Sequence, residues 1–230
     1  MSVAFDFSAI LNALPYLIFD GLGLTLALTF LAGLMGLALG IVLAVLRLSP
    51  WRVLSVPAGL YVNLMRSVPL VLIIFWFYFL VPYIGAWIVG SPRPIQVGAF
   101  RSALVSFTLF EAAYFCEIIR SGIQSIRRGQ VAAGLALGLN RRQTFLKVVL
   151  PQALRNMTPS LLTRLIVLFQ DTSLVYVVAL TDFLGAASKV GARDGRLTEL
   201  YVFVALVYLA LCFGASRLVK RLEARWKLAR

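Results

Sequence analysis

The sequence contains no histidine and has two cysteines in 230 residues. Without an imidazole, the chain has no histidine to act as a general base or to bind a metal ion. Cys116 and Cys212 are far apart and each lies inside an apolar run, which favours packing roles over a disulfide framework or a metal site. The glycine-rich loop of nucleotide-binding ATPases and the serine elbow of α/β-hydrolases are also missing. These absences argue against the common classes of soluble enzyme.

Charged residues are scarce, and acidic residues are scarcer than basic ones. They make up 13% of the chain, with 9 acidic against 22 basic residues, whereas about 25% is usual in a soluble domain. Hydrophobic residues make up 61%, which predicts an integral membrane protein. The net charge of +13 is typical of basic residues on cytoplasmic loops. No zinc-finger spacing or aromatic-plus-basic sheet pattern suggests binding to nucleic acid.

Long apolar runs predict an all-α membrane domain with about five transmembrane helices. The spans are expected at about Leu22–Leu46, Leu70–Ile88, Phe100–Ile119, from Pro151 or Pro159 to Leu180, and Leu200–Ser216. The expected organisation is an N-terminal lead-in over residues 1–20, a membrane domain over 21–217 and a basic tail over 218–230. The first residues lack the basic segment of a secretion signal. In the first span, Gly33, Gly36 and Gly40 either admit a close neighbouring helix or are simply tolerated.

The distribution of Lys and Arg predicts the orientation in the membrane. One side of a five-span topology holds Arg47, Arg52, the central loop and the tail, and the other side holds fewer basic residues. The richer side faces the cytoplasm in most membrane proteins. We therefore expect an extracytoplasmic N-terminal lead-in and a cytoplasmic C-terminal tail.

Several ionisable or polar residues fall inside or beside the apolar spans. A central carboxylate costs roughly 2.5–3.5 kcal/mol on insertion scales, so such residues usually face the protein interior or a water-filled cavity. Arg164 and Asp171 are two helical turns apart and share a face. The candidates for a substrate pathway are Arg66, Glu111, Arg164, Gln170, Asp171, Thr172 and Ser173. Each of them either lines a pathway or satisfies another buried charge. Glu117 and Arg120, three residues apart, are expected to form a local structural pair.

The stretch from Glu117 to Pro151 is the most polar part of the chain. Small residues crowd its middle, and basic residues occur at both ends. Gly138 is expected to break two short helices, with Asn140 as the next N-cap. The stretch is either a docking surface for a cytoplasmic protein or a topological anchor whose apolar residues lie on lipid headgroups.

Three motifs carry a resemblance to a known family. EIIRSGIQSIRRGQ, from Glu117 to Gln130, is followed by Gly138 and by Leu150-Pro151-Gln152-Ala153. Together with RSVPL at 66–70 and QDTSL at 170–174, this pattern resembles the permease subunits of ABC importers of the polar amino acid family. FEAAY at 110–114 and VLFQDTSLVY at 167–176 are most similar to glutamate/aspartate-type permease subunits. The resemblance implies the type I transmembrane domain of ABC importers.

The family's cytoplasmic loop couples transport to ATP hydrolysis, and the resemblance assigns this role to one set of positions. They are Gln130, Ala132, Ala133, Gly134, Leu137, Gly138, Leu139, Arg141, Arg142, Leu150 and Pro151. One departure stands out, because Ala132-Ala133-Gly134 occupies the place of the family's Glu-Ala-Ala. The missing carboxylate argues against a salt-bridge account of docking and leaves the packing of small residues.

The resemblance implies a transporter subunit that hydrolyses nothing itself. Its expected partners are a cytoplasmic ABC ATPase dimer, a second permease that is identical or homologous, an extracytoplasmic amino acid binding protein and membrane lipid, in the bacterial inner membrane. No cofactor is expected in this chain, because ATP and Mg would be bound by the ATPase. The expected cargo is glutamate or aspartate. Alternatives are a basic or neutral amino acid, a stand-alone secondary transporter, and a membrane enzyme acting on an anionic headgroup.

An anionic cargo needs positive or hydrogen-bond-donating groups along its path. We hypothesise that Arg164 contacts the substrate carboxylate. The alternative is that Arg164 pairs with Asp171 or Glu111. Arg66 would serve if it faces the cavity rather than the cytoplasmic interface.

Overall fold

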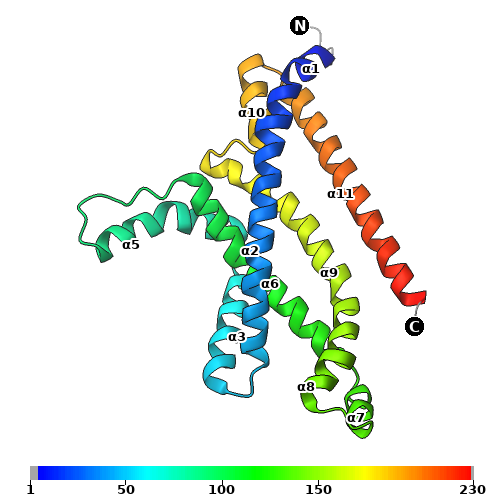
Figure 1. Ribbon diagram of the computed structural model, residues 1–230. Coiled ribbons are helices and arrows are strands. Elements are labelled where there is room, and N and C mark those ends of the chain that lie inside the picture. The colour runs from blue at the N-terminus through cyan, green and yellow to red at the C-terminus, as the bar shows by residue number, and fades with distance from the viewer. Residues whose placement is uncertain (1–4, 229–230) are drawn as a thin grey trace. The chain divides into compact units, whose positions relative to one another are not determined.

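The computed structural model describes residues 5–228, and this part of the chain consists of helices and their connections (Figure 1). Among the described residues, five helices are long and apolar enough to cross a membrane. They are Phe7–Leu48, Leu70–Ile88, Ala99–Gln124, Arg141–Val178 and Leu197–Trp226. The predicted all-α membrane architecture with five spans is therefore confirmed. Residues 1–4 of the expected lead-in and 229–230 of the expected tail lie outside the described part.

Most spans extend beyond their predicted bounds. The first begins with α1 (Phe7–Pro15) and continues through the π-helical segment η1 (Tyr16–Leu22) into α2 (Gly23–Leu48), so most of the lead-in is helical. Asp6 begins this helix by accepting the N–H of Ser8 at 2.9 Å, which the hydropathy pattern does not reveal. The fourth span begins with α8 (Arg141–Thr144) and runs through η3 (Phe145–Val149) into α9 (Leu150–Asp171) and η4 (Thr172–Val178).

Prolines lie inside these spans without ending them. The second span consists of α4 (Leu70–Phe75), η2 (Trp76–Leu80) and α5 (Val81–Ile88). The three segments η1, η2 and η3 are π-helical. Each of them lies within two residues of a proline: Pro15, Pro82 or Pro151. Because proline lacks an N–H and its ring crowds the preceding turn, a locally widened helix accommodates it. The helix therefore continues past Pro82, and it also continues past Pro151, one of the two residues at which the sequence predicted the start of the fourth span.

The chain divides into two compact units, and the long helices α2, α6 (Ala99–Gln124), α9 and α11 (Leu197–Leu228) each contribute to both. The first unit comprises the residues up to Leu34, Val68–Thr108 and Ile166–Ala215. The second comprises Met35–Ser67, Leu109–Leu165 and the residues from Ser216 onward. Each unit has its own buried apolar cluster.

In the first unit, α10 (Phe183–Asp194) packs against η1. A Cβ on Gly21 would come within 2.9 Å of the Ala186 Cβ and 3.1 Å of the Phe183 Cα, so only glycine permits this approach. The Thr25 hydroxyl accepts the N–H of Phe183 at 3.0 Å and donates to the Gly21 carbonyl at 3.1 Å. The core members are Ala13, Leu17, Phe183, Ala186, Ala187, Val190, Leu200 and Val204.

In the second unit, α3 (Arg52–Ser67) returns alongside the end of α2, and both pack with α6 and α9 (Figure 1). The core members are Ala44, Val62, Ala113, Cys116, Ile119 and Met157. A Cβ on Gly40 would lie 2.7 Å from the Phe115 Cβ, so the predicted close helix approach is present at Gly40. A Cβ on Gly122 would lie 2.7 Å from the Met157 Cβ. These contacts hold the two charged groups described next at fixed positions along α6.

Candidate functional site

One face of α6 carries Glu111, Tyr114 and Glu117, spaced three residues apart, in the second unit. Residues at this spacing lie above one another on a helix. Glu111 is fully buried, while Tyr114 and Glu117 are partly exposed. This face of α6 is therefore buried at Glu111 and more exposed toward the C-terminal end of the helix.

Glu111 forms a bidentate ion pair with Arg164 of α9. The Arg164 Nε donates to Oε2 of Glu111 at 2.9 Å, and Nη2 donates to Oε1 at 2.5 Å. The Arg164 side chain is 14% exposed and Glu111 is 0% exposed. Such parallel N–H···O bonds are the strongest form of this contact, and they neutralise a carboxylate that could not be buried alone. The pairing of Arg164 with Glu111 is thus one of the alternatives left open by the sequence.

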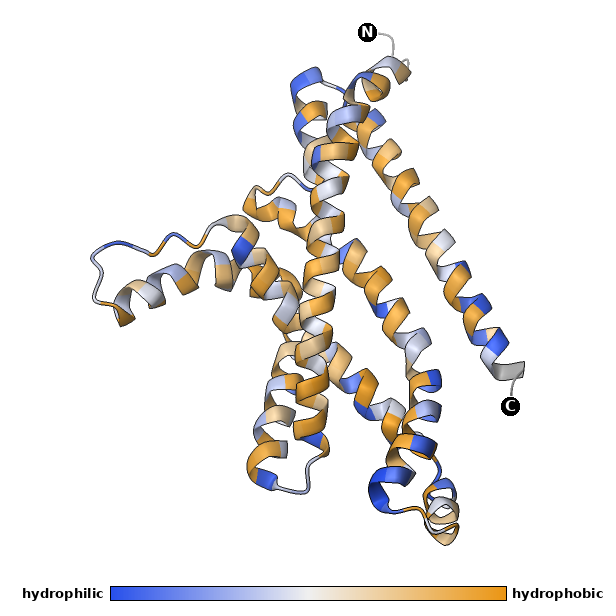
Figure 2. Ribbon diagram, in the orientation of Figure 1, coloured by the Kyte–Doolittle hydropathy of each residue, from blue (hydrophilic) through white to orange (hydrophobic). Residues whose placement is uncertain are grey.

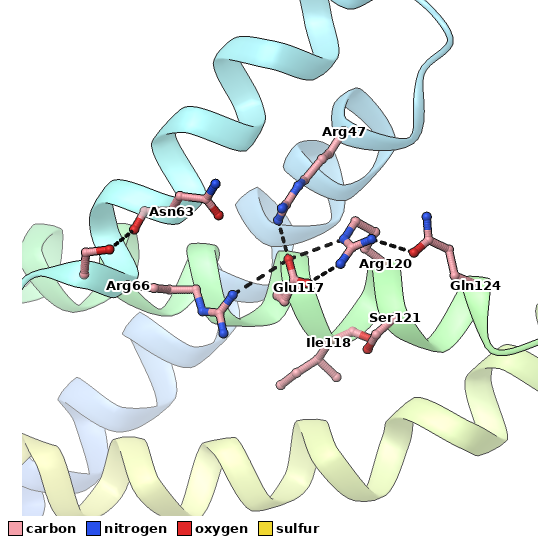
Figure 3. A network of polar contacts seen from close by, with 9 residues as sticks. Arg47, Asn63, Arg66, Glu117, Ile118, Arg120, Ser121 and Gln124 are labelled. Atoms are coloured by element: carbon pink, nitrogen blue, oxygen red, sulfur yellow. Dashed lines mark hydrogen bonds and ion pairs between the residues drawn. The ribbon is translucent and has the colours of Figure 1, made fainter.

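Glu117 lies at the centre of a cluster of three arginines, the Glu117 cluster, shown in Figure 3. Arg47 from the end of α2 and Arg120 from the next turn of α6 both bond to the carboxylate. The Arg66 Nη1 lies 3.9 Å from Oε2 of Glu117. The predicted Glu117–Arg120 pair is present, and the sequence missed that Arg47 and Arg66 join it. The one available signal was that the first and third spans end on the same side of the membrane.

Tyr114 connects these two charged groups. The guanidinium carbon of Arg164 lies 3.9 Å from the centre of its ring, and that of Arg66 lies 5.4 Å away. Both distances are within the range of cation–π attraction. The ring also packs against Phe110 at 5.0 Å between centroids. Tyr114 is the last residue of the FEAAY stretch, but the sequence assigned it no role, because an aromatic residue in an apolar span ordinarily indicates packing.

The other pathway candidates belong to the first unit, at the end of α9 and the start of η4. Thr172 is buried and its hydroxyl donates to the Phe169 carbonyl at 2.7 Å, while the Ser173 hydroxyl donates to the Gln170 carbonyl at 2.8 Å. Gln170 is exposed and Asp171 is partly buried. Both hydroxyls therefore bond to the backbone at the transition from α9 into the tighter helix η4.

The central loop folds as α7 (Arg128–Ala136), a turn, and α8. Gly138 has φ +81, a left-handed conformation that favours glycine. Asn140 caps α8 by accepting the N–H of Gln143 at 2.9 Å, and the Gln143 side chain accepts the N–H of Asn140 at 3.0 Å. The predicted break at Gly138 and the predicted cap at Asn140 are therefore both present.

The small residues of this loop serve two different purposes. Gly134 is buried, and a Cβ there would come within 2.9 Å of the Thr144 Cγ2, so Gly134 holds α7 against α8. Ala132, Ala133 and Ala136 are exposed instead, and Leu137 is 83% exposed. Also exposed are Gln130, Gly138, Arg141, Arg142 and Pro151, while Leu139 and Leu150 are partly exposed. α7 and α8 thus present small apolar residues beside hydrophilic ones (Figure 2).

Asp182, in the connection between the fourth and fifth spans, is a buried carboxyl group. It caps α10 by accepting the N–H of Leu184 at 3.1 Å and of Gly185 at 2.9 Å. Burial raises its pKa to about 6, against the opposing effect of these two N–H donors. Among the described residues there is no cluster of acidic and cysteine side chains that could hold a metal ion.

Comparison with known proteins defines the class. Residues 36–228 match the family of binding-protein-dependent transport system inner membrane components. The chain also superposes on a chain from the crystal structure of an amino acid ABC transporter with a TM-score of 0.86. That match has 28% sequence identity and covers 97% of this chain and 100% of the other. The protein is therefore a permease subunit of the ABC importer family, a transporter component and not an enzyme.

Two curated relatives place it among the amino acid permeases. It is 48% identical over 221 residues to the glutamate/aspartate import permease protein GltK of Escherichia coli O6:H1, covering 96% of this chain and 98% of the relative. It is 35% identical over 211 residues to a probable glutamine ABC transporter permease protein, GlnP, of Bacillus subtilis, covering 90% and 93%. The predicted family is confirmed. Membership implies, in general, a separate ATPase, a second permease and a binding protein.

Proposed function

We propose that this chain is the permease subunit of an importer for glutamate and aspartate. The observation that carries the proposal is its 48% identity to GltK over nearly the whole of both chains, against 35% to a glutamine permease. The excess of arginine over carboxylate around Glu117 is compatible with an anionic cargo. A permease for a basic or neutral amino acid is the alternative.

The proposed coupling element is the surface formed by α7, the turn at Gly138 and α8. It would dock on a cytoplasmic ATPase that binds ATP and Mg²⁺, so this chain would need no cofactor of its own. The exposed Ala132, Ala133 and Ala136 allow a partner to approach the backbone of α7 closely, and Leu137 offers an apolar side chain to a groove. Exposed Arg141 and Arg142 supply charge contacts in place of the carboxylate that is missing at Ala132.

Docking of the ATPase on α7 and α8 also sets the proposed orientation of the chain in the membrane. The loop and the tail would face the cytoplasm, and the N-terminal residues would face the binding protein outside. The second permease would be a copy of this chain or a homologue. The candidate pathway residues are Arg66, Glu111 and Arg164 in the second unit, and Gln170, Asp171, Thr172 and Ser173 in the first unit. A direct contact between Arg164 and the cargo, as hypothesised from the sequence, would require Arg164 to release Glu111, and intact glutamate uptake by Arg164→Gln would refute it.

The cargo is tested by uptake of radiolabelled L-glutamate into proteoliposomes that contain the assembled transporter, ATP inside and the binding protein outside. We expect unlabelled aspartate to compete and glutamine and arginine to leave uptake unchanged. Competition by glutamine or arginine at concentrations where aspartate has no effect would overturn the proposed cargo.

The coupling surface is tested by ATP hydrolysis in the same preparation, comparing wild type with Gly138→Pro and Leu137→Ser, with and without loaded binding protein. Proline fixes φ near −65°, so it cannot adopt the conformation found at Gly138. We expect both variants to assemble and to lose stimulation by loaded binding protein. Normal stimulation in both would mean that the loop is only a topological anchor.

A further inference from the structure

The helix α11 is longer than a membrane crossing requires. Its 32 residues make it about 48 Å long, whereas the hydrocarbon core of a bilayer is about 30 Å thick. Residues 197–216 are enough for one crossing, which takes about 20 residues, and a tilt of about 20° changes this only slightly. Residues 217–226 of the same helix therefore lie at the level of the lipid headgroups or beyond it.

Residues 217–226, the α11 basic segment, carry a strong positive charge. Arg217, Lys220, Arg221 and Arg225 are all exposed, and Glu223 is the only acidic residue in the segment. Along α11, Figure 2 shows the change from hydrophobic to hydrophilic residues toward this end. Clusters of about four to eight Lys and Arg next to a membrane helix are typical of segments that attract anionic lipids.

The basic residues continue an exposed apolar face of the span. Leu206, Leu209 and Phe213 are 58%, 63% and 55% exposed and follow one another at helical spacing. Arg217 comes four residues after Phe213, and Lys220 comes three residues later, so both lie on the same face of α11. Among the five spans of the described chain, α11 is also the least buried. A face that contacts acyl chains along the span would thus meet the phosphates of the same lipids at its basic end.

The adjacent face of the α11 basic segment is apolar. Leu218, Leu222 and Trp226 are spaced four residues apart, and Leu218 is 65% exposed while the other two are partly exposed. Tryptophan is enriched where a membrane meets water. A helix end with one basic and one apolar face suits the boundary between headgroups and acyl chains, where each face finds its own surroundings.

We propose that the α11 basic segment binds the phosphates of anionic phospholipids, such as phosphatidylglycerol, and anchors this end of α11 in one leaflet. The inference goes beyond the proposed function, because it applies to any amino acid cargo. A guanidinium pairs with two phosphate oxygens at once, and the Lys220 ammonium adds a point charge. Each basic residue near an anionic surface strengthens the association about fivefold.

The test places the assembled transporter in liposomes of zwitterionic phosphatidylcholine that contain a phosphatidylglycerol probe with a photoreactive diazirine on its headgroup. After illumination, mass spectrometry measures the adducts on residues 217–226. We expect labelling that unlabelled phosphatidylglycerol displaces and added phosphatidylcholine does not. Labelling should also fall at high salt, because exposed charges are screened. An unlabelled segment, or equal displacement by both lipids, would overturn the proposal.

Two variants of the α11 basic segment separate charge from other contacts. Combining Lys220→Gln, Arg221→Gln and Arg225→Gln should lower the labelling at least tenfold. Combining Lys220→Arg, Arg221→Lys and Arg225→Lys keeps every charge and should retain most of it. Equal losses in the two variants, or no loss in the first, would contradict binding by charge. If the first variant fails to fold, Arg221→Gln and Arg225→Gln are measured singly, and unchanged labelling in both would sink the proposal.

The matched control removes three exposed arginines outside α11, by Arg93→Gln, Arg101→Gln and Arg193→Gln together. It changes the net charge by the same amount, and labelling of residues 217–226 should stay as in wild type. An equal loss in the control would mean that only the net charge of the protein matters, which would overturn the assignment. The melting temperature and basal ATP hydrolysis of each variant show that it is folded and assembled.

A protein partner is the competing occupant of the α11 basic segment. If the ATPase or the second permease covered the segment, the probe would label the isolated permease but not the assembled transporter, and the proposal would fall. The cargo plays no part in this assay. A transporter that imports glutamine or arginine would therefore overturn the proposed function and leave the lipid site standing, and the reverse also holds.

Discussion

Removing Arg164 while leaving Glu111 in place should destabilise the second unit strongly. The Glu111 carboxylate is 0% exposed, and both of its oxygens accept from Arg164. Removing one partner of a buried ion pair typically costs about 3–5 kcal/mol, because the remaining charge has lost its compensation. For a chain of this size, each kcal/mol corresponds to roughly 2–4 °C in melting temperature. We therefore expect Arg164→Gln to lower the melting temperature by about 6–20 °C.

The interaction energy between Arg164 and Glu111 is measured by a double-mutant cycle on thermal unfolding of the purified protein in detergent. Glu111→Gln alone leaves a neutral amide beside Arg164 and should cost less than Arg164→Gln. Combining the two substitutions removes both charges and should recover most of the lost stability. The control is Arg193→Gln, which removes a 72% exposed arginine paired with Asp194 and should cause no measurable shift.

Two outcomes would refute this reasoning. A negligible shift in Arg164→Gln would mean that water reaches Glu111 or that the carboxyl group is already protonated. Additive losses in the double variant would mean that the two side chains contribute independently. Either result would also remove the argument that Arg164 is unavailable to the cargo.

Three further predictions concern the two units separately. Asp182 loses its proton near its ordinary pKa of 3.8 when unfolded but near about 6 when folded, so the unfolded state binds fewer protons between these values. The free energy of unfolding should therefore fall by up to about 3 kcal/mol as pH rises through this window. The melting temperature should show the same pH dependence, and Asp182→Asn, which keeps a capping oxygen, should remove it. Gly40→Val should lower the melting temperature by several degrees, because its side chain would meet Phe115 and the backbone of α6, whereas Gly214→Val, with open space around it, should not. Cys116 is fully buried and should react with a small maleimide only after the protein unfolds, so rapid labelling of a Cys212→Ser variant would contradict the packing of the second unit.

The sequence predicted the local features of the proposed coupling surface well, because each depends on a few neighbouring residues. Gly138 adopts a left-handed conformation and Asn140 caps the N-terminus of α8, as expected from the preferences of glycine and asparagine at helix ends. The division of labour among the small residues was not predictable. Gly134 faces α8 while Ala132 and Ala133 face outward, and that depends on how α7 folds back onto α8.

Helix bounds were predicted less well than the number of spans. Apolar runs long enough to cross a bilayer are visible in composition, so five spans followed directly. The ends of a helix depend on caps and on accommodation of proline, neither of which changes hydropathy. For this reason the first helix begins at Phe7, and the fourth span continues through Pro151 by means of η3.

By itself, the sequence determined the class of protein, because hydrophobic length, charge asymmetry and short motifs are properties of neighbouring residues. Only the tertiary structure decided which charges meet. Glu111 and Arg164 are 53 positions apart, and Arg47 and Glu117 are 70 apart. Such partners depend on how α2, α3, α6 and α9 pack, and each arginine had several carboxylates within possible reach. The packing commits Arg164 to Glu111 and leaves Arg66 beside Tyr114, because two other arginines already occupy Glu117.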